Sequence, residues 1–146
     1  MQLEATMAPF SGTLSTKFIP YPQRLLEVAQ SLIDQSEFSI AVVVAHMACE
    51  VATERSLSES IARKGLQYLE EPLLDFLSGY NLASDRIRKL YSALTGDTVQ
   101  NASFWQKFKA SATRRNEIVH AGAIVGKAEA EESHKAASDL VAHLKS

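Results

Sequence analysis

Apolar residues recur along most of this chain at the spacing of one face of an α-helix, and glycines interrupt the pattern at intervals. The first such face comprises Leu25, Val28, Ala29, Leu32 and Ile33. Glycine favours the position just past a helix end, because the residue there often adopts the left-handed conformation. Four of the six glycines stand just past a predicted helix: Gly65, Gly79, Gly96 and Gly122. No segment has a convincing strand pattern, so the sequence predicts an all-α protein.

The chain divides into a short irregular N-terminal arm over residues 1–20 and a helical domain over residues 21–146. Within the domain we expect a first helix that begins at Tyr21 and further helices at about 37–64, 71–77, 85–94, 104–120 and 127–144. Short loops between helices are typical of antiparallel bundles. The predicted fold class is therefore an antiparallel bundle of five to six helices.

Three serines are predicted to cap helix N-termini, where a side-chain oxygen accepts a hydrogen bond from an unpaired backbone N–H. Ser36 precedes the second helix, with Glu37 in its first turn, and Ser84 precedes the fourth. Ser103 has Gln106 three residues later, which is the spacing of a capping box.

The composition indicates one domain, because 146 residues are enough to bury a core without a disulfide. The one cysteine, Cys49, cannot form an intrachain disulfide, which fits a reducing compartment. We expect no signal peptide, because Met1–Gly12 contains no basic residue and no long apolar run. The longest apolar run, Ile40–Ala45, is too short to cross a membrane. We therefore expect a cytoplasmic protein that does not enter a membrane.

A net charge of −2 argues against a protein that coats nucleic acid, but the charge is unevenly distributed. Residues 1–75 carry five Lys and Arg against ten Asp and Glu, whereas residues 76–127 carry eight against three. Two interpretations stay open: the second segment meets a phosphate-bearing partner, or the charge merely fluctuates along the chain.

Arg115 lies on the apolar face of the predicted helix at 104–120. On a helical wheel this face is defined by Phe108, Ala112 and Val119, and Arg115 falls inside it, at about 20° from Phe104. An ionised guanidinium on such a face is costly unless it is paired. Arg115 therefore meets a carboxylate, or the face opens into a cleft or an interface near the helix end.

Two carboxylates one turn apart on the helix at 37–64, Glu50 and Glu54, are the candidate charge partners of Arg115. They are also a candidate carboxylate pair for acid/base chemistry. We favour Glu50 as the charge partner, because Val43, Met47 and Val51 indicate that its stretch of helix faces the core.

Asn116 and His120 lie on one face beside Arg115, because they are four residues apart. A cation, an amide and an imidazole are thereby gathered on the last turns of one helix. The alternative is an ordinary helix end, with Arg115 extending from the core edge to water, Asn116 at the surface and His120 as a C-terminal cap.

The run from Arg115 to Gly122, Arg-Asn-Glu-Ile-Val-His-Ala-Gly, resembles the R-N-x-x-x-H motif of the HEPN superfamily, the higher eukaryotes and prokaryotes nucleotide-binding domains. An aromatic helix segment, Phe104–Phe108, leads into it, and an upstream helix carries an acid, Glu50, as in these domains. The resemblance covers about residues 22–146. It implies a homodimeric helical bundle, with Arg115 and His120 of both subunits facing a shared cleft.

Many members of that superfamily are metal-independent ribonucleases, often toxins or phage-defence effectors, and others are inactive modules that dimerise or bind a nucleotide. Some toxin members carry a Tyr just after the motif His, which a partner enzyme modifies. This chain departs from that pattern, because Ala121, Gly122 and Ala123 stand there. The resemblance implies as partners a second copy, RNA or a nucleotide, and an antitoxin protein.

The residue types suit cleavage of RNA by its own 2′-hydroxyl, which needs a base, an acid and positive charge at the phosphorus. His120 can take or give the proton, because imidazole titrates near neutrality. Arg115 can clamp phosphate oxygens bidentately, and Asn116 can orient His120 or contact the phosphate. No metal and no cofactor is required. Three cations of the same helix are candidate phosphate contacts or a solvated face: Lys107, Lys109 and Arg114.

Other residues carry weaker signals. His46 and Cys49, three residues apart, could share a metal ion, but no second pair completes a site, so no metal is expected. His134 and His143 are expected at the surface, and Trp105 in the core or at an interface.

Two functions follow from these observations. The first is a HEPN-type endoribonuclease that acts as a toxin or phage-defence effector, and the intact Arg115, Asn116 and His120 favour it. The second is a non-catalytic HEPN-like module that dimerises and binds a nucleotide or a protein. A generic helical bundle with a chance motif ranks third.

Overall fold

The computed structural model describes residues 20–145. This part of the chain contains six α-helices and two short 3₁₀ turns, joined by loops, and no strand. The helices are α2 (Tyr21–Asp34), α3 (Phe38–Arg63), α4 (Glu70–Asp75), α5 (Asp85–Thr95), α6 (Trp105–Ala121) and α7 (Lys127–Lys145). The turns are η1 (Gln67–Leu69) and η2 (Val99–Asn101). The prediction of an all-α fold is confirmed, whereas the predicted arm, apart from Pro20, lies outside the described residues.

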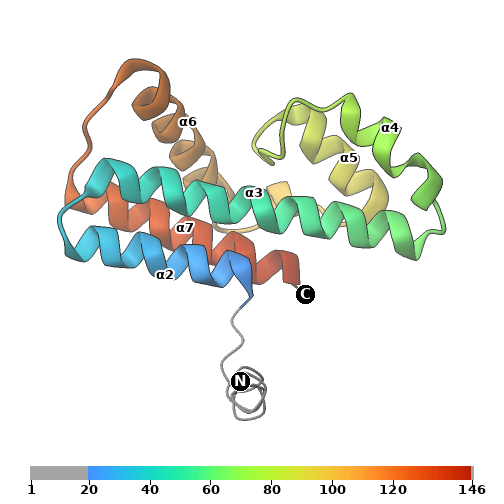
Figure 1. Ribbon diagram of the computed structural model, residues 1–146, viewed down its shortest axis with the longest axis horizontal. Helices are drawn as coiled ribbons and strands as arrows, with labels where there is room; N and C mark the ends of the chain where they lie inside the picture. Colours follow the sequence, from blue (N-terminus) through green and yellow to red (C-terminus); the bar gives the residue numbers. More distant parts are fainter. Residues whose placement is uncertain (1–19, 146) are drawn as a thin grey trace, which may run out of the picture.

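The long helix α3, with 26 residues, organises the fold (Figure 1). α2 and α7 run along one part of α3, and α6 packs against both α3 and α7, so these four helices form a bundle. α2 runs antiparallel to α3 and α7, whereas α3 and α7 run in the same direction, with Ala130 in one core cluster with Val42 and Val141 in another with Ala52. α4 and α5 lie beside the other end of α3. Buried apolar side chains from the four bundle helices meet in the core, among them Ala29, Ala45, Cys49, Phe108 and Leu140.

The turn between α2 and α3 differs from the prediction that Ser36 caps α3. Ser36 has a φ of 64°, in the left-handed region, and its N–H donates to the carbonyl of Ile33 at 2.9 Å. The N–H of Glu37 donates to the carbonyl of Leu32 at 2.8 Å. This pair of bonds is a Schellman motif, so Ser36 closes α2 instead of opening α3.

The predicted capping hydrogen bonds are also absent at the starts of α5 and α6. Ser84 occupies the N-cap position of α5, but its side chain makes no cap hydrogen bond. The capping box of Ser103 and Gln106 is absent, because α6 begins at Trp105 and Phe104 takes the N-cap position. In contrast, Gly96 and Gly122 end α5 and α6 with φ values of 77° and 66°, as predicted.

One member of the predicted apolar face of α2 is exposed. Leu25, Ala29 and Ile33 are buried, but Val28 is 42% exposed. The buried face of α2, which packs on α3 and α7, is therefore narrower than the apolar face that the sequence predicted. Across the described residues, none of the helices combines the length and the apolar character needed to cross a membrane.

Candidate functional site

The last turns of α6 present the residues of the R-N-x-x-x-H motif at the protein surface. Asn116 and His120 are exposed, and the side chain of Arg115 is 20% exposed. One and two turns earlier on the same face, Ala112 and Phe108 are buried against the core. The apolar face of α6 therefore enters the core at its first half and opens to the surface at Arg115.

Arg115 meets Glu50, one of its two predicted charge partners. Arg115 Nη2 lies 3.6 Å from Glu50 Oε2, which is an ion pair but longer than a hydrogen bond. Glu54 is exposed and has no ion pair with Arg115. The reason given for favouring Glu50 was wrong, because Met47 is 41% exposed and the stretch lies at the edge of the core.

His46 is a buried neighbour of Glu50, and its place near Arg115 was not predicted from the sequence. Its side chain is 2% exposed, and its ring stacks on Phe108 with the ring centroids 6.0 Å apart. His46 Nε2 lies 4.0 Å from Glu50 Oε2, and neither ring nitrogen makes a hydrogen bond within the described residues. The signal for this contact was the four-residue spacing of His46 and Glu50, which places both on one side of α3.

Burial and charge set the protonation states around Arg115. Burial, and then the charge of Arg115, lower the pKa of His46 to about 4, so its ring is neutral at neutral pH. Burial raises the pKa of the Glu50 carboxyl, and the positive charge of Arg115 opposes this rise. Burial, and then the charge of Glu50, raise the pKa of Cys49, so its thiol stays protonated. Within residues 20–145, no cluster of three His, Cys, Asp or Glu side chains that could hold a metal ion forms at His46 and Cys49 or elsewhere.

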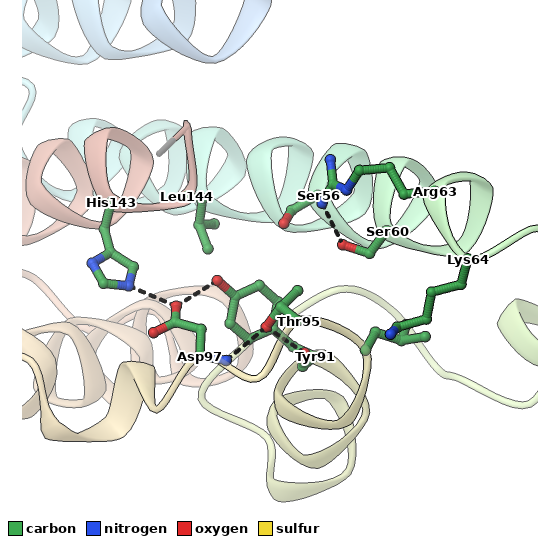
Figure 2. Close-up of a pocket in the computed structure, with 10 residues that line it drawn as sticks. Ser56, Ser60, Arg63, Lys64, Tyr91, Thr95, Asp97, His143 and Leu144 are labelled. Atoms are coloured by element: carbon green, nitrogen blue, oxygen red, sulfur yellow. Dashed lines mark hydrogen bonds and ion pairs between the residues drawn. The ribbon is translucent and has the colours of Figure 1, made fainter.

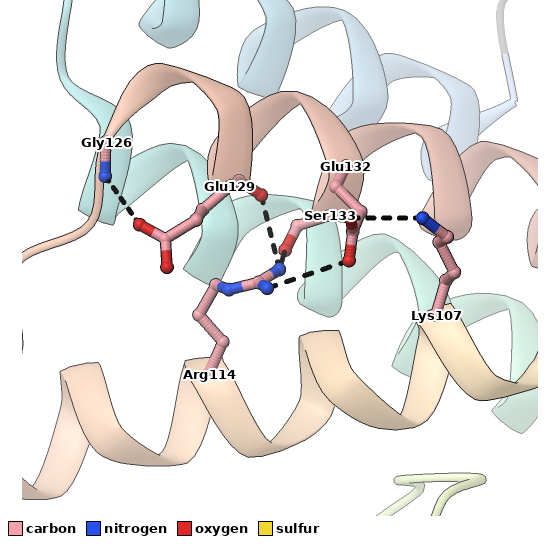
Figure 3. Close-up of polar contacts among 6 residues, drawn as sticks. All are labelled: Lys107, Arg114, Gly126, Glu129, Glu132 and Ser133. Atoms are coloured by element: carbon pink, nitrogen blue, oxygen red, sulfur yellow. Dashed lines mark hydrogen bonds and ion pairs between the residues drawn. The ribbon is translucent and has the colours of Figure 1, made fainter.

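Two of the three predicted phosphate-binding cations hold α6 against α7 instead (Figure 3). Arg114 Nη1 donates to Ser133 Oγ at 2.7 Å and to the carbonyl of Glu129 at 3.2 Å. Arg114 Nη2 lies 3.7 Å from Glu132, and Lys107 Nζ lies 3.2 Å from the same carboxylate. We name this group the α6–α7 clamp. Its members are Lys107, Arg114, Glu129, Glu132 and Ser133.

Lys109 differs from the other two cations of α6. Its side chain is exposed, and it forms no ion pair within residues 20–145. Phosphate contact by Lys109 therefore stays a prediction. The guanidinium of Arg114, in contrast, is already bound to residues of α7.

The elements that carry Arg115 and Glu50, and the loop after α6, also carry four exposed apolar side chains. Two come from α3, one from α6 and one from the loop after α6, and we call them the apolar face: Ile40, Met47, Val119 and Ile124. Ser39 holds the loop to α3, because its Oγ lies 3.5 Å from the carbonyl of Ala123 and accepts from the N–H of Val125 at 3.2 Å. Exposed apolar clusters of this kind often mark contact sites for other molecules.

The two histidines of α7, His134 and His143, were predicted to lie at the surface but are half-buried, and each contacts another element. His134 Nε2 lies 2.9 Å from the carbonyl of Leu26, which links α7 to α2. His143 Nε2 lies 2.7 Å from Asp97 Oδ2, in the loop after α5. Trp105, expected in the core or at an interface, is 5% exposed and packs in the core.

Comparisons of the chain with models of protein families, with curated protein sequences and with solved structures give no match. What the site can do therefore rests on its own geometry: an arginine paired with Glu50, an exposed amide and imidazole, and exposed apolar side chains on the same elements.

Proposed function

We propose that this chain is a metal-independent endoribonuclease that acts as a homodimer, with a HEPN-like site formed by Arg115, Asn116 and His120. The observation that carries the proposal is the placement of Arg115. It forms an ion pair with Glu50 where α6 reaches the surface, and Asn116 and His120 are exposed on the same helix end.

Arg115 keeps most of its hydrogen-bonding capacity for a phosphate. A guanidinium has five N–H donors, and the contact with Glu50 is an ion pair at 3.6 Å, beyond hydrogen-bond length. Arg115 Nε is buried and makes no hydrogen bond within the described residues, so the donors that can face a phosphate are those of the two Nη groups. Glu50 therefore orients the guanidinium without consuming the fork of donors that matches two phosphate oxygens.

The proposed reaction uses the 2′-hydroxyl of RNA as the nucleophile. His120 removes the proton of this hydroxyl, and its oxygen attacks the adjacent phosphorus. Arg115 stabilises the negative charge that develops on the phosphoryl oxygens. The bond to the 5′-oxygen breaks, and His120 of the partner subunit donates the proton that this oxygen needs. The products are a 2′,3′-cyclic phosphate and a 5′-hydroxyl.

The apolar face supports the dimer that this reaction needs. Ile40, Met47, Val119 and Ile124 are between 41% and 92% exposed, and a second copy would remove them from water. A two-fold axis at this face presents the same patch twice and places the two copies of Arg115 and His120 near one another. One cleft then holds both a base and an acid.

In a cell, such an enzyme would act as a toxin or phage-defence effector that an antitoxin protein holds inactive. The test is expression of the wild type and of His120→Ala in bacteria. The wild type should arrest growth and degrade RNA, and His120→Ala should do neither. Glu117→Ala changes an exposed residue of the same turns and is the matched control, expected to behave as the wild type.

The second candidate function is a non-catalytic module that dimerises through the same face and binds a nucleotide. The Arg115–Glu50 ion pair favours it, because this pair already compensates the arginine within one chain. Under this alternative, wild type and His120→Ala affect growth equally, and the dimer remains.

A further inference from the structure

A cavity of about 550 Å³ lies between the second half of α3, α5 with the loop after it, and the end of α7 (Figure 2). None of its lining residues belongs to the R-N-x-x-x-H motif or to the apolar face. Its volume is within the range of about 300–1,000 Å³ that is usual for sites of small ligands.

One side of the cavity is rich in positive charge and hydroxyl groups. Arg63 and Lys64, exposed at the end of α3, line it together with the buried Ser56 and Ser60. Arg63 Nη2 donates to Ser60 Oγ at 3.1 Å, which directs the guanidinium along the cavity and leaves the hydroxyl proton of Ser60 to donate. Two cations beside two hydroxyls form a donor set that suits a phosphate group.

The other side carries a carboxylate in a fixed orientation. Asp97 Oδ2 accepts a hydrogen bond from the hydroxyl of Tyr91 at 2.6 Å and lies 2.7 Å from His143 Nε2. Burial, and then the hydrogen bond to Asp97, raise the pKa of Tyr91, so its hydroxyl remains a donor. The Asp97 N–H donates to Thr95 Oγ1, and Ser92 Oγ donates to the carbonyl of Asp97. The second carboxylate oxygen of Asp97 makes no hydrogen bond within the described residues.

We propose that this cavity binds a small phosphate monoester whose other end carries hydroxyl or amino groups. The phosphate lies at Arg63 and Lys64, and the donor groups of the ligand reach Asp97. Leu94 and Leu144 supply the apolar part of the wall. Sugar phosphates and mononucleotides share this chemistry, and the site does not depend on any activity at Arg115.

Calorimetric titration of the full chain tests the proposal with four probes: ribose 5-phosphate, adenosine 5′-monophosphate, ribose and adenosine. The phosphorylated probe of at least one pair should bind with a Kd below about 1 mM, and its unphosphorylated form at least about tenfold more weakly. Tighter binding of adenosine 5′-monophosphate than of ribose 5-phosphate assigns the site to nucleotides, and equal binding assigns it to sugar phosphates.

Variants place the ligand in this cavity. The double variant Arg63→Gln/Lys64→Gln should weaken binding by at least about tenfold. The matched control, Arg86→Gln/Lys89→Gln, removes the same two charge types from exposed positions of α5 outside the cavity and should bind as the wild type. Arg115→Ala should also bind as the wild type. Absence of binding by both phosphorylated probes, unchanged binding by Arg63→Gln/Lys64→Gln, or loss of binding in Arg115→Ala would overturn the proposal.

This test is independent of RNA cleavage. A chain that cleaves RNA and binds neither phosphorylated probe refutes the ligand site alone. A chain that binds a probe through Arg63 and Lys64 and cleaves no RNA supports the ligand site and counts against the ribonuclease.

Discussion

The guanidinium of Arg115 and the carboxylate of Glu50 lie 3.6 Å apart, nitrogen to oxygen, across the contact between α6 and α3. The same carboxylate lies 4.0 Å from the ring of His46. One acidic side chain thus links the arginine at the surface opening of α6 to a histidine in the core. Because these side chains are mostly removed from water, a change in any one alters the electrostatic environment of the others.

Glu50→Gln should lower the free energy of unfolding by about 1 kcal/mol, because it leaves the mostly buried cation of Arg115 without its charge partner. Urea denaturation of Glu50→Gln, Arg115→Gln and the double variant gives the coupling, expected at about 0.5–1 kcal/mol. Glu54→Gln removes an exposed carboxylate one turn away and should change stability by less than about 0.5 kcal/mol. Equal losses in the Glu50 and Glu54 variants would show that the ion pair contributes nothing.

Stability should fall as the pH is lowered from 6.5 toward 4, because the pKa of His46 is about 4 in the folded chain and 6.5 in the unfolded chain. Within this window the unfolded chain binds more protons, so stability rises with pH. Between about pH 7 and about pH 5 the contribution of His46 amounts to about 2 kcal/mol. Burial raises the pKa of Glu50, which acts in the opposite direction, so the comparison with a variant isolates His46.

The measurement is urea denaturation at both pH values. His46→Gln should lose less stability than the wild type on acidification. His120→Gln removes an exposed histidine and should retain the wild-type dependence. Parallel pH profiles for the wild type and His46→Gln would refute the assignment.

Arg114→Ala should lower the free energy of unfolding by about 1–2 kcal/mol, because it removes three contacts of the α6–α7 clamp and leaves Ser133 buried without its donor. Lys109→Ala, at an exposed position of the same helix, should leave the stability unchanged to within about 0.5 kcal/mol. Thermal or urea denaturation distinguishes the two variants. An Arg114→Ala variant as stable as the wild type would return Arg114 to the set of residues available for phosphate.

Sedimentation should show a dimer at about tens of micromolar protein, with the apolar face as its interface. Val119→Asp should shift the protein to a monomer, because a charge is costly to bury in an apolar contact. Tyr68→Asp places the same charge at an exposed aromatic residue outside the apolar face, 75% exposed in η1, and should leave the dimer intact. A wild-type protein that is monomeric at this concentration would refute the predicted dimer and its interface.

The helices were predictable from the sequence because their stop signals are local. Gly96 and Gly122 adopt the left-handed conformation that favours glycine. For the five helices whose first and last residues were both predicted, each end agrees with the structure to within two residues. The capping side chains at helix starts were less predictable than the start positions, because a serine before a helix can instead end the preceding helix. Ser36 does so, since its left-handed conformation allows two backbone bonds that close α2.

The surroundings of Arg115 were only partly predictable. The helical wheel placed Arg115 on an apolar face, because the direction of a side chain is a property of its own helix. The need to pair its charge then pointed to the two carboxylates one turn apart on α3. The spacing of His46 and Glu50 was a local signal that went unused, whereas the stacking of His46 on Phe108 depends on how α3 and α6 pack. The engagement of Arg114 with Ser133 depends in the same way on the packing of α6 and α7.

The central claim is the reaction at Arg115 and His120, and RNA cleavage by the purified dimer in EDTA tests it most directly. Arg115→Ala and His120→Ala should each reduce the cleavage rate by at least about 100-fold while remaining dimeric. Asn116→Ala should reduce it less, and Arg115→Lys should not restore it, because an ammonium group cannot reproduce the fork of donors. Glu117→Ala should cleave as the wild type.

The products identify the nucleophile. RNA should be cut to fragments that end in a 2′,3′-cyclic phosphate or a 3′-phosphate, and DNA of the same sequence should remain intact, because it lacks the 2′-hydroxyl. A purified dimer that cuts no RNA, with or without added divalent metal, or whose His120→Ala variant cleaves as fast as the wild type, would contradict the account.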